Sequence, residues 1–328
     1  MDCIINVRAK SRNTGRDSGL FRHPDFLKLW TGQTISALGS RITREGLPMT
    51  AVLVLGAQPA QMGFLAATGA ASVLLFGLLA GVWTDRLKRR PILITADLLR
   101  AAVLATIPLA AWARRLSMTQ LYGTAAIAGL CTVFFDVAYQ SYLPSLVQRE
   151  ELVEANSKLA QSDAIAEIAG PSLTGALVQL ITAPAAILLD AASFFVSAVS
   201  VAMIRKSEPL SAARPQTHWK AETLAGLRFV FDHPVLRPLA WFSACGFFFF
   251  GFIGTLYVLY AIQDLHVPPA ALGVAITVGG LGAMVGATLA PRIARTWGAG
   301  PAFLGSMVVA AVSLVLIVAA RGRLSVVL

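Results

Sequence analysis

The sequence is divided into nine apolar segments, each about as long as a helix that crosses a lipid bilayer. About 20 residues at about 1.5 Å per residue span the roughly 30 Å of hydrocarbon in a membrane. Because lipid cannot hydrogen-bond to an exposed backbone, helices are the expected form of such segments. The pattern predicts an all-α integral membrane protein with about nine transmembrane helices, at residues 29–56, 61–83, 91–112, 119–140, 158–180, 184–204, 238–262, 269–290 and 301–320.

Composition supports this fold class and argues against others. Of the 328 residues, 56% are hydrophobic and 13% are charged, whereas a soluble domain has about 25% charged residues. The net charge of +10 could indicate nucleic-acid binding, but the cations form no basic face with interleaved aromatic residues. Most of them lie in the polar stretches outside the apolar segments. We therefore expect the lipid bilayer, and no nucleic acid, as a partner.

The distribution of lysine and arginine predicts the orientation. With a cytoplasmic N-terminus, twenty of the 27 lysines and arginines fall on the cytoplasmic side. Three more lie inside apolar segments, and the external stretches hold Arg114, Arg115, Arg321 and Arg323. Short loops rich in positive charge stay in the cytoplasm. The sequence thus predicts a multi-pass protein of the plasma membrane with its N-terminus inside the cell.

The segments group into two unequal halves. We expect a cytoplasmic tail at 1–25, an N-terminal six-helix bundle at 26–204, a cytoplasmic linker at 205–237 and a C-terminal bundle at 238–328. In the linker, apolar residues recur at helical spacing from 219 to 237. This pattern is typical of an amphipathic helix on the inner membrane surface, with a solvated linker helix as the alternative.

The polar stretch after the second apolar segment carries a recognisable pattern. Four cations fall within five positions, and the residues that form the pattern are Gly81, Asp85, Arg86, Arg89 and Arg90. They resemble the G-x-x-x-D-R-x-G-R-R loop between helices 2 and 3 of major facilitator superfamily (MFS) transporters. Lys88 stands where that pattern usually has glycine.

The resemblance implies a fold of two six-helix halves that rock about a central site. Against twelve expected spans, three are absent here, and the second half is expected to be incomplete. It also implies that the loop is a conformational switch, in which the carboxylate of Asp85 meets the positive end of a second-half helix. That partner is helix 11 of the family, so the latch is expected to have no counterpart in this chain.

The fifth apolar segment contains Gly170-Pro171-Ser-Leu-Thr-Gly175. Glycine allows two helix backbones to approach closely, and proline removes a helix hydrogen bond. The run resembles the G-P-x-x-G-G signature of the antiporter branch, which implies an external seal that favours export. The alternative is a packing kink without directional meaning. Further segments, such as Gln33 to Gly39 and Leu189 to Phe194, resemble the sequences of the bacterial exporters that include the enterobactin exporter and macrolide-efflux proteins.

Ionisable residues within apolar segments are the candidates for moving protons or charge, because an ionisable group at that depth is costly and usually paired. Arg41 and Glu45 are four residues apart and could neutralise each other, either as a proton site or as a structural lock. Asp163 and Glu167 share a face and should repel each other unless a cation lies nearby. The remaining candidates are Asp136 and Asp190, while Asp97 and Arg100, three residues apart, are expected to form a structural pair.

Together these features predict a secondary active transporter. The expected function is proton-coupled export of a small lipophilic molecule, such as a drug, a macrolide or a siderophore-like compound. A truncated, transport-inactive fragment is the alternative. No nucleotide-binding loop occurs and the cysteines lack metal-site spacing. We therefore expect no cofactor, no nucleotide and, since the histidines lie outside the apolar segments, no enzymatic activity.

Overall fold

The computed structural model describes residues 20, 23–84, 87–206 and 228–319. Nine long helices run through this part of the chain: α1 (Pro24–Leu55), α2 (Pro59–Thr84), α3 (Arg89–Trp112), α4 (Met118–Leu146), α5 (Leu152–Ile181), α6 (Ala183–Ala202), α8 (Leu236–Leu259), α9 (Pro269–Trp297) and α10 (Ala299–Ala319). They coincide with the nine predicted apolar segments within a few residues, except that α1 and α5 begin earlier and α4 and α9 end later.

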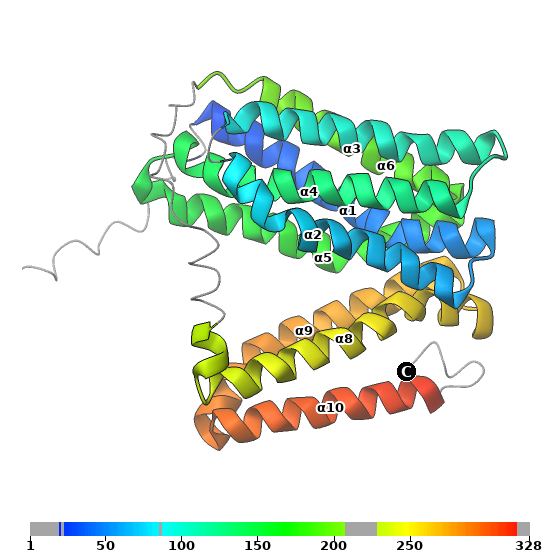
Figure 1. Cartoon of the computed structure of the whole chain (residues 1–328), viewed down its shortest axis with the longest axis vertical. Coiled ribbons are helices and arrows are strands. Elements are labelled where there is room, and N and C mark those ends of the chain that lie inside the picture. The colour runs from blue at the N-terminus through cyan, green and yellow to red at the C-terminus, as the bar shows by residue number, and fades with distance from the viewer. Residues whose placement is uncertain (1–19, 21–22, 85–86, 207–227, 320–328) are drawn as a thin grey trace, which may run out of the picture.

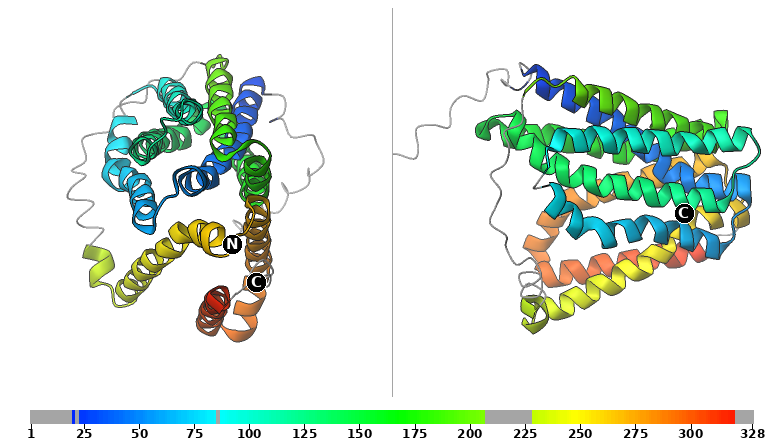
Figure 2. Two further views of the ribbon diagram at one scale, coloured as in Figure 1. Left: turned by 90° about the vertical axis from the view of Figure 1, so that its right-hand side faces the viewer. Right: turned by 45° about the horizontal axis from the view of Figure 1, so that its top comes forward.

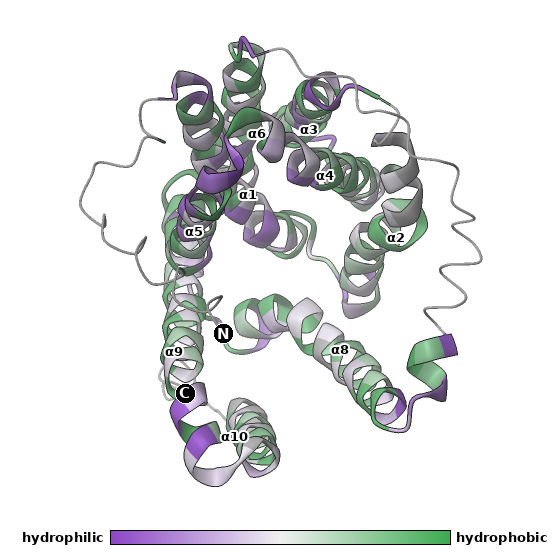
Figure 3. Ribbon diagram, turned by 90° about the vertical axis from the view of Figure 1, so that its left-hand side faces the viewer, coloured by the Kyte–Doolittle hydropathy of each residue, from purple (hydrophilic) through white to green (hydrophobic). Residues whose placement is uncertain are grey.

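Seven of the described helices are long and apolar enough to cross a membrane. The two others are α1, which carries several charged residues, and α10, which lies next to residues outside the described part. Figure 3 shows that hydrophobic residues predominate along the helices, with hydrophilic residues at many of their ends and along α1. The all-α membrane fold predicted from the sequence is confirmed.

Helices α1 to α6 form a bundle in which α6 packs on α1 and α3, α4 packs on α2 and α3, and α5 packs on α1 (Figure 2). We call the end of this bundle that holds the start of α1 and the end of α6 the near end, and the opposite end the far end. The far end holds the α1–α2, α3–α4 and α5–α6 connections. Gly56 ends α1 in the left-handed conformation at φ 61°, and its N–H bonds to the carbonyls of the last turn.

The second half, α8 to α10, contacts the first half toward the far end. Figure 1 shows α8 and α9 lying against the bundle on the right and diverging from it on the left. Burial follows this arrangement: Val258 and Leu259 at the end of α8 are 4% and 6% exposed, while Trp241 near its start is 58% exposed. A short π-helix, Tyr260–Asp264, continues α8, and Gln263 donates a hydrogen bond to the carbonyl of Ala57 in the first half.

Part of the predicted tail and linker lies outside the described residues. Of the tail, Leu20 and residues 23–25 are described, and Asp25 already belongs to α1. Of the linker, residues 205–206 and 228–237 are described, and 228–232 are helical. The amphipathic-helix prediction therefore stays a prediction.

Candidate functional site

A cavity of about 440 Å³ lies inside the first half, between α1, α3, α4 and α5. Its volume is within the range of sites that hold drug-sized molecules. Polar and aromatic side chains share its wall. The residues that line it are Gln33, Thr34, Ser36, Ala37, Ser40, Arg41, Arg44, Arg100, Thr132, Phe135, Asp136, Tyr139, Leu159, Ser162 and Asp163.

The cations on α1 pair across to α5. The guanidinium of Arg41 forms an ion pair with Glu167, and Arg44 lies 3.8 Å from the other oxygen of the same carboxylate. The ion pair of Arg41 is thus with an acid on the neighbouring helix, and Glu45, the partner expected from spacing within α1, interacts with Arg41 only at longer range. Glu45 lies half-buried nearby, within electrostatic reach of both arginines. Arg41 also lies within electrostatic reach of Asp163, so it is the nearby cation that reduces the expected repulsion between Asp163 and Glu167.

Asp136 on α4 and Asp163 on α5 both line the cavity and are within electrostatic reach of each other. Neither forms an ion pair within the part of the chain that the structure describes. Tyr139 and Phe135, stacked at 5.8 Å between ring centroids, belong to the same wall. The structure thus brings together two acids that the sequence placed on separate helices.

Arg100 is the cavity residue whose role the sequence analysis missed. Its predicted ion pair with Asp97 is confirmed, and both side chains are buried. In addition its guanidinium lies between the rings of Phe135 and Phe194, at 4.5 and 4.1 Å from their centroids, and reaches the cavity wall. The i, i+3 spacing predicted the Asp97–Arg100 ion pair, but it did not show that Arg100 lies at the cavity wall.

Asp190 does not line the cavity. It is fully buried between α6 and α1, where Ser193 donates a hydrogen bond of 3.0 Å to its Oδ1. A Cβ on Gly39 of α1 would lie 2.5 Å from that oxygen. The carboxyl group therefore sits directly against the backbone of the neighbouring helix.

The Gly170–Gly175 run lies where α5 meets both α1 and α9. A Cβ on Gly170 would lie 2.5 Å from that of Arg41, and a Cβ on Gly175 would lie 2.2 Å from the carbonyl oxygen of Pro269. Gly273 of α9 makes the reciprocal approach to the carbonyl of Pro171. Ser172 and Thr277 add a hydrogen bond of 2.7 Å. The run therefore joins the two halves of the protein.

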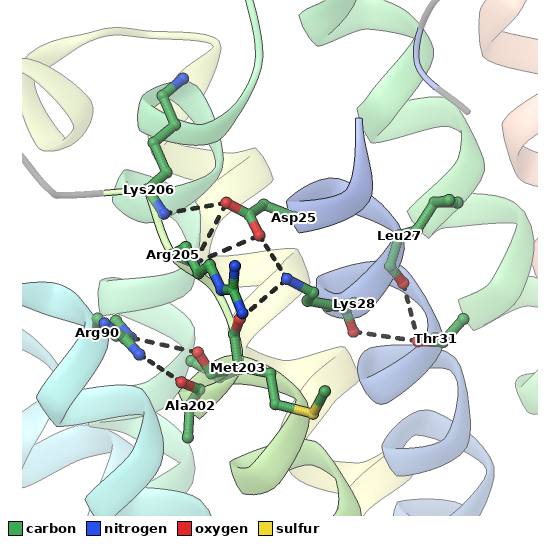
Figure 4. Close-up of polar contacts among 10 residues, drawn as sticks. Asp25, Leu27, Lys28, Thr31, Arg90, Ala202, Met203, Arg205 and Lys206 are labelled. Atoms are coloured by element: carbon green, nitrogen blue, oxygen red, sulfur yellow. Dashed lines mark hydrogen bonds and ion pairs between the residues drawn. The ribbon is translucent and has the colours of Figure 1, made fainter. Parts of the chain in front are cut away.

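The loop that the sequence predicts to be a conformational switch is described in part. Gly81 belongs to α2 and Arg89 begins α3, but Asp85 and Arg86 lie outside the described residues, as does the predicted latch. The guanidinium of Arg90 donates hydrogen bonds to the carbonyls of Val201 and Ala202 at the end of α6 (Figure 4). A cation at this position satisfies carbonyls that the helix leaves free and complements its dipole.

Asp25 fixes the chain that leaves α6 at the near end. Its carboxylate accepts hydrogen bonds from Lys28 Nζ at 2.8 Å and from the backbone N–H groups of Arg205 and Lys206 at 3.3 and 3.0 Å (Figure 4). Slight burial opposes ionisation, but these bonds outweigh it and hold the pKa of Asp25 below its ordinary value of 3.8. Lys28 also donates to the carbonyl of Met203.

The sequence model of the Major Facilitator Superfamily matches residues 29–328. The chain belongs to this superfamily. Its members are transporters rather than enzymes, and the two-half arrangement described above is their fold. The described residues contain no group of three or more His, Cys, Asp or Glu that could hold a metal ion.

Curated relatives within the superfamily include exporters. The MFS-type transporter YfiS of Bacillus subtilis is 26% identical over 278 residues, covering 83% of this chain and 65% of YfiS. The multidrug efflux pump Tap of Mycobacterium tuberculosis is 28% identical over 287 residues, covering 84% and 67%. Macrolide efflux protein A of Streptococcus pyogenes is 25% identical over 185 residues, covering 55% and 44%. The chain spans about two thirds of the length of YfiS and Tap.

Solved superfamily structures share the fold. A bacterial homologue of the human lysosomal transporter Spinster, inward-facing and unoccupied, has a TM-score of 0.62 at 14% identity, with 86% of this chain and 64% of that chain covered. A bacterial homologue of the iron transporter ferroportin, also inward-facing, has a TM-score of 0.61 at 20% identity, with 85% and 70% covered.

Proposed function

We propose that the protein is a secondary active transporter that exports a small lipophilic molecule across the plasma membrane by alternating access, driven by proton entry. The observation that carries the proposal is the cavity between α1, α3, α4 and α5, together with close contacts between the two halves at the far end. Alternating access, in which one half rocks against the other, requires a binding space and a contact between the halves about which they can move. We call the Gly170–Gly175 contact with α9 the joint.

The proposed orientation places the near end in the cytoplasm, in agreement with the positive charge of its loops. In this orientation the Gly170–Gly175 joint seals the external side and the diverging ends of α8 and α9 face inward. Similarity to inward-facing transporters supports this arrangement. A lipophilic molecule could then enter the cavity from the cytoplasm or the inner leaflet.

The charges around the cavity favour a basic or neutral substrate over an acid. Arg41 and Arg44 are balanced by Glu167 and the adjacent Glu45. Asp136 and Asp163 remain, beside aromatic rings that can cover a hydrophobic surface. Two such carboxylates attract a cation in a space of low dielectric constant. A weakly basic, macrolide-like drug therefore fits better than an anionic siderophore.

Efflux from cells that express the chain tests this proposal. Cells are loaded with a fluorescent lipophilic cation, and retention is compared with and without a protonophore. The proposal predicts lower retention than in cells with empty vector, and loss of the difference when the protonophore is added. Equal retention in both cells would contradict transport and favour an inactive fragment. Efflux that is unchanged by the protonophore would contradict proton coupling but not transport.

A further inference from the structure

The charged side chains that are buried in the described part of the protein form one group behind the cavity wall. They are Asp97 and Asp190, both 0% exposed, and Arg100, 5% exposed. Asp97 and Arg100 are ion-paired on α3, and both are within electrostatic reach of Asp190 on α6. The group holds two acids and one cation. It would carry a charge of −1 if both acids were ionised.

Neither acid has the hydrogen bonds that a buried double charge requires. Oδ2 of Asp97 and Oδ2 of Asp190 are buried without a hydrogen-bond partner. The hydroxyl of Thr43 on α1 lies near Asp190, but its geometry also leaves it without a bond. A buried carboxylate with an unsatisfied oxygen is strongly disfavoured, and such a group takes up a proton instead.

The neighbouring elements do not supply a second buried cation. Helix α1 contributes the neutral Thr43 and Gln33, and Gln33 donates a hydrogen bond to the hydroxyl of Ser197, which lies near Asp97. Helix α4 contributes Cys131 and Asp136, which both interact electrostatically with Arg100. Helix α5 also contacts α6, but none of its described titratable groups interacts electrostatically with Asp190.

We infer that Asp97 and Asp190 share one exchangeable proton, held beside Arg100, and that this cluster is the proton site of the transporter. Two acids that compete for one cation behave as a coupled pair, in which the proton belongs to both. Arg100 and Gln33 line the cavity, so a single side chain separates the buried acids from it. No proton is created or consumed: one binds from one side of the membrane and leaves to the other.

Arg100 gives this site a connection to the substrate, because it faces both the buried acids and Asp136 in the cavity. When the proton leaves, both buried acids are ionised and compensate the guanidinium more fully. Asp136 is then free to bind a cation. When a proton returns, the charge of Arg100 is again available to Asp136 and the cation is released. This exchange role rests on the proposed function, whereas the shared proton does not.

Infrared difference spectroscopy of the purified full-length chain at neutral pH tests the shared proton directly. A protonated carboxyl group and an ionised one have separate C=O stretching bands. Wild type is compared with Asp190→Asn and with Asp97→Asn. In each variant Arg100 neutralises the remaining acid, so each difference spectrum should show the loss of one protonated carboxyl band. Asp136→Asn, whose acid lies outside the buried cluster, should leave that band in place.

Two results would overturn the inference: loss of an ionised carboxylate band in both variants, or a protonated band that persists in Asp97→Asn. Elution as a single species and an unchanged melting temperature verify that each variant is folded. Efflux from reconstituted vesicles tests the exchange role separately. The account predicts that Asp190→Asn loses its dependence on the proton gradient. An intact band without any efflux would contradict the proposed function and leave the shared proton standing.

Discussion

Gly175 on α5 and Pro269 at the start of α9 are in backbone contact: a Cβ on Gly175 would lie 2.2 Å from the carbonyl oxygen of Pro269. Gly273 and Pro171 make the same approach in reverse. These reciprocal contacts hold the two halves together toward the far end. The joint depends on the absence of a side chain, which makes it sensitive to a single methyl group.

Gly175→Ala should therefore open the joint. The added methyl group meets a backbone atom that cannot rotate away, and overpacking of this kind costs about 1–3 kcal/mol. We expect a lower melting temperature and greater labelling of a cysteine placed at Thr277. Gly251→Ala on α8 is the matched control, because nothing lies within 4 Å of its Cβ position. An unchanged melting temperature in Gly175→Ala would contradict the close approach.

The Arg41–Glu167 ion pair should couple α1 to α5. Because the Glu167 side chain is 55% exposed, we expect a coupling energy of only about 0.5–1 kcal/mol. A double-mutant cycle with Arg41→Gln and Glu167→Gln, followed by thermal unfolding, measures it. The same cycle with Glu45→Gln is the comparison. Stronger coupling of Arg41 to Glu45 than to Glu167 would show that the intrahelical pair forms after all.

Asp136→Asn and Asp163→Asn should weaken the transport of cations. Loss of one carboxylate beside a bound cation is expected to raise its KM about tenfold, which corresponds to about 1.4 kcal/mol. A neutral compound of similar size should be affected much less. Asp232→Asn, an exposed acid on the linker, serves as the control. Equal effects on the charged and neutral compounds would argue that the acids only maintain the shape of the cavity.

The hydrogen bonds of Asp25 predict a loss of order at the near end in acid. Because the pKa of Asp25 is lowered in the folded protein, its stabilising contribution is present above the unfolded value of 3.8. It is lost as the pH falls below that value through the folded pKa. Hydrogen exchange of the Arg205 and Lys206 amides should be slow at neutral pH and relatively faster in acid. In Asp25→Asn, exchange that is no faster than in wild type at neutral pH would contradict this role.

The sequence predicted the helices well and the side-chain partners poorly, for a physical reason. The length of an apolar segment is set by the membrane, so residues 269–290 were found to be a helix without knowledge of its neighbours. The partner of Arg41 depends on how α1 and α5 are rotated against each other. Spacing within one helix pointed to Glu45, whereas packing between helices selects Glu167.

The same limit applies to depth. Hydropathy placed both Asp136 and Asp190 inside the membrane but could not tell which face of each helix they occupy. The structure puts Asp136 on the cavity wall and Asp190 behind it, against Gly39. The reach of Arg100 into the cavity was likewise hidden, because the i, i+3 pair with Asp97 already accounted for its charge.

Pulsed electron–electron distance measurements test alternating access most directly. One spin-label pair spans the near end, at Leu87 and Trp297, and the other spans the far end, at Arg115 and Asp264; all four residues are exposed. The account predicts that a lipophilic cation and a change of pH shift both distances in opposite directions, so that the near end closes as the far end opens. Distances that stay constant at both ends under every condition would contradict it.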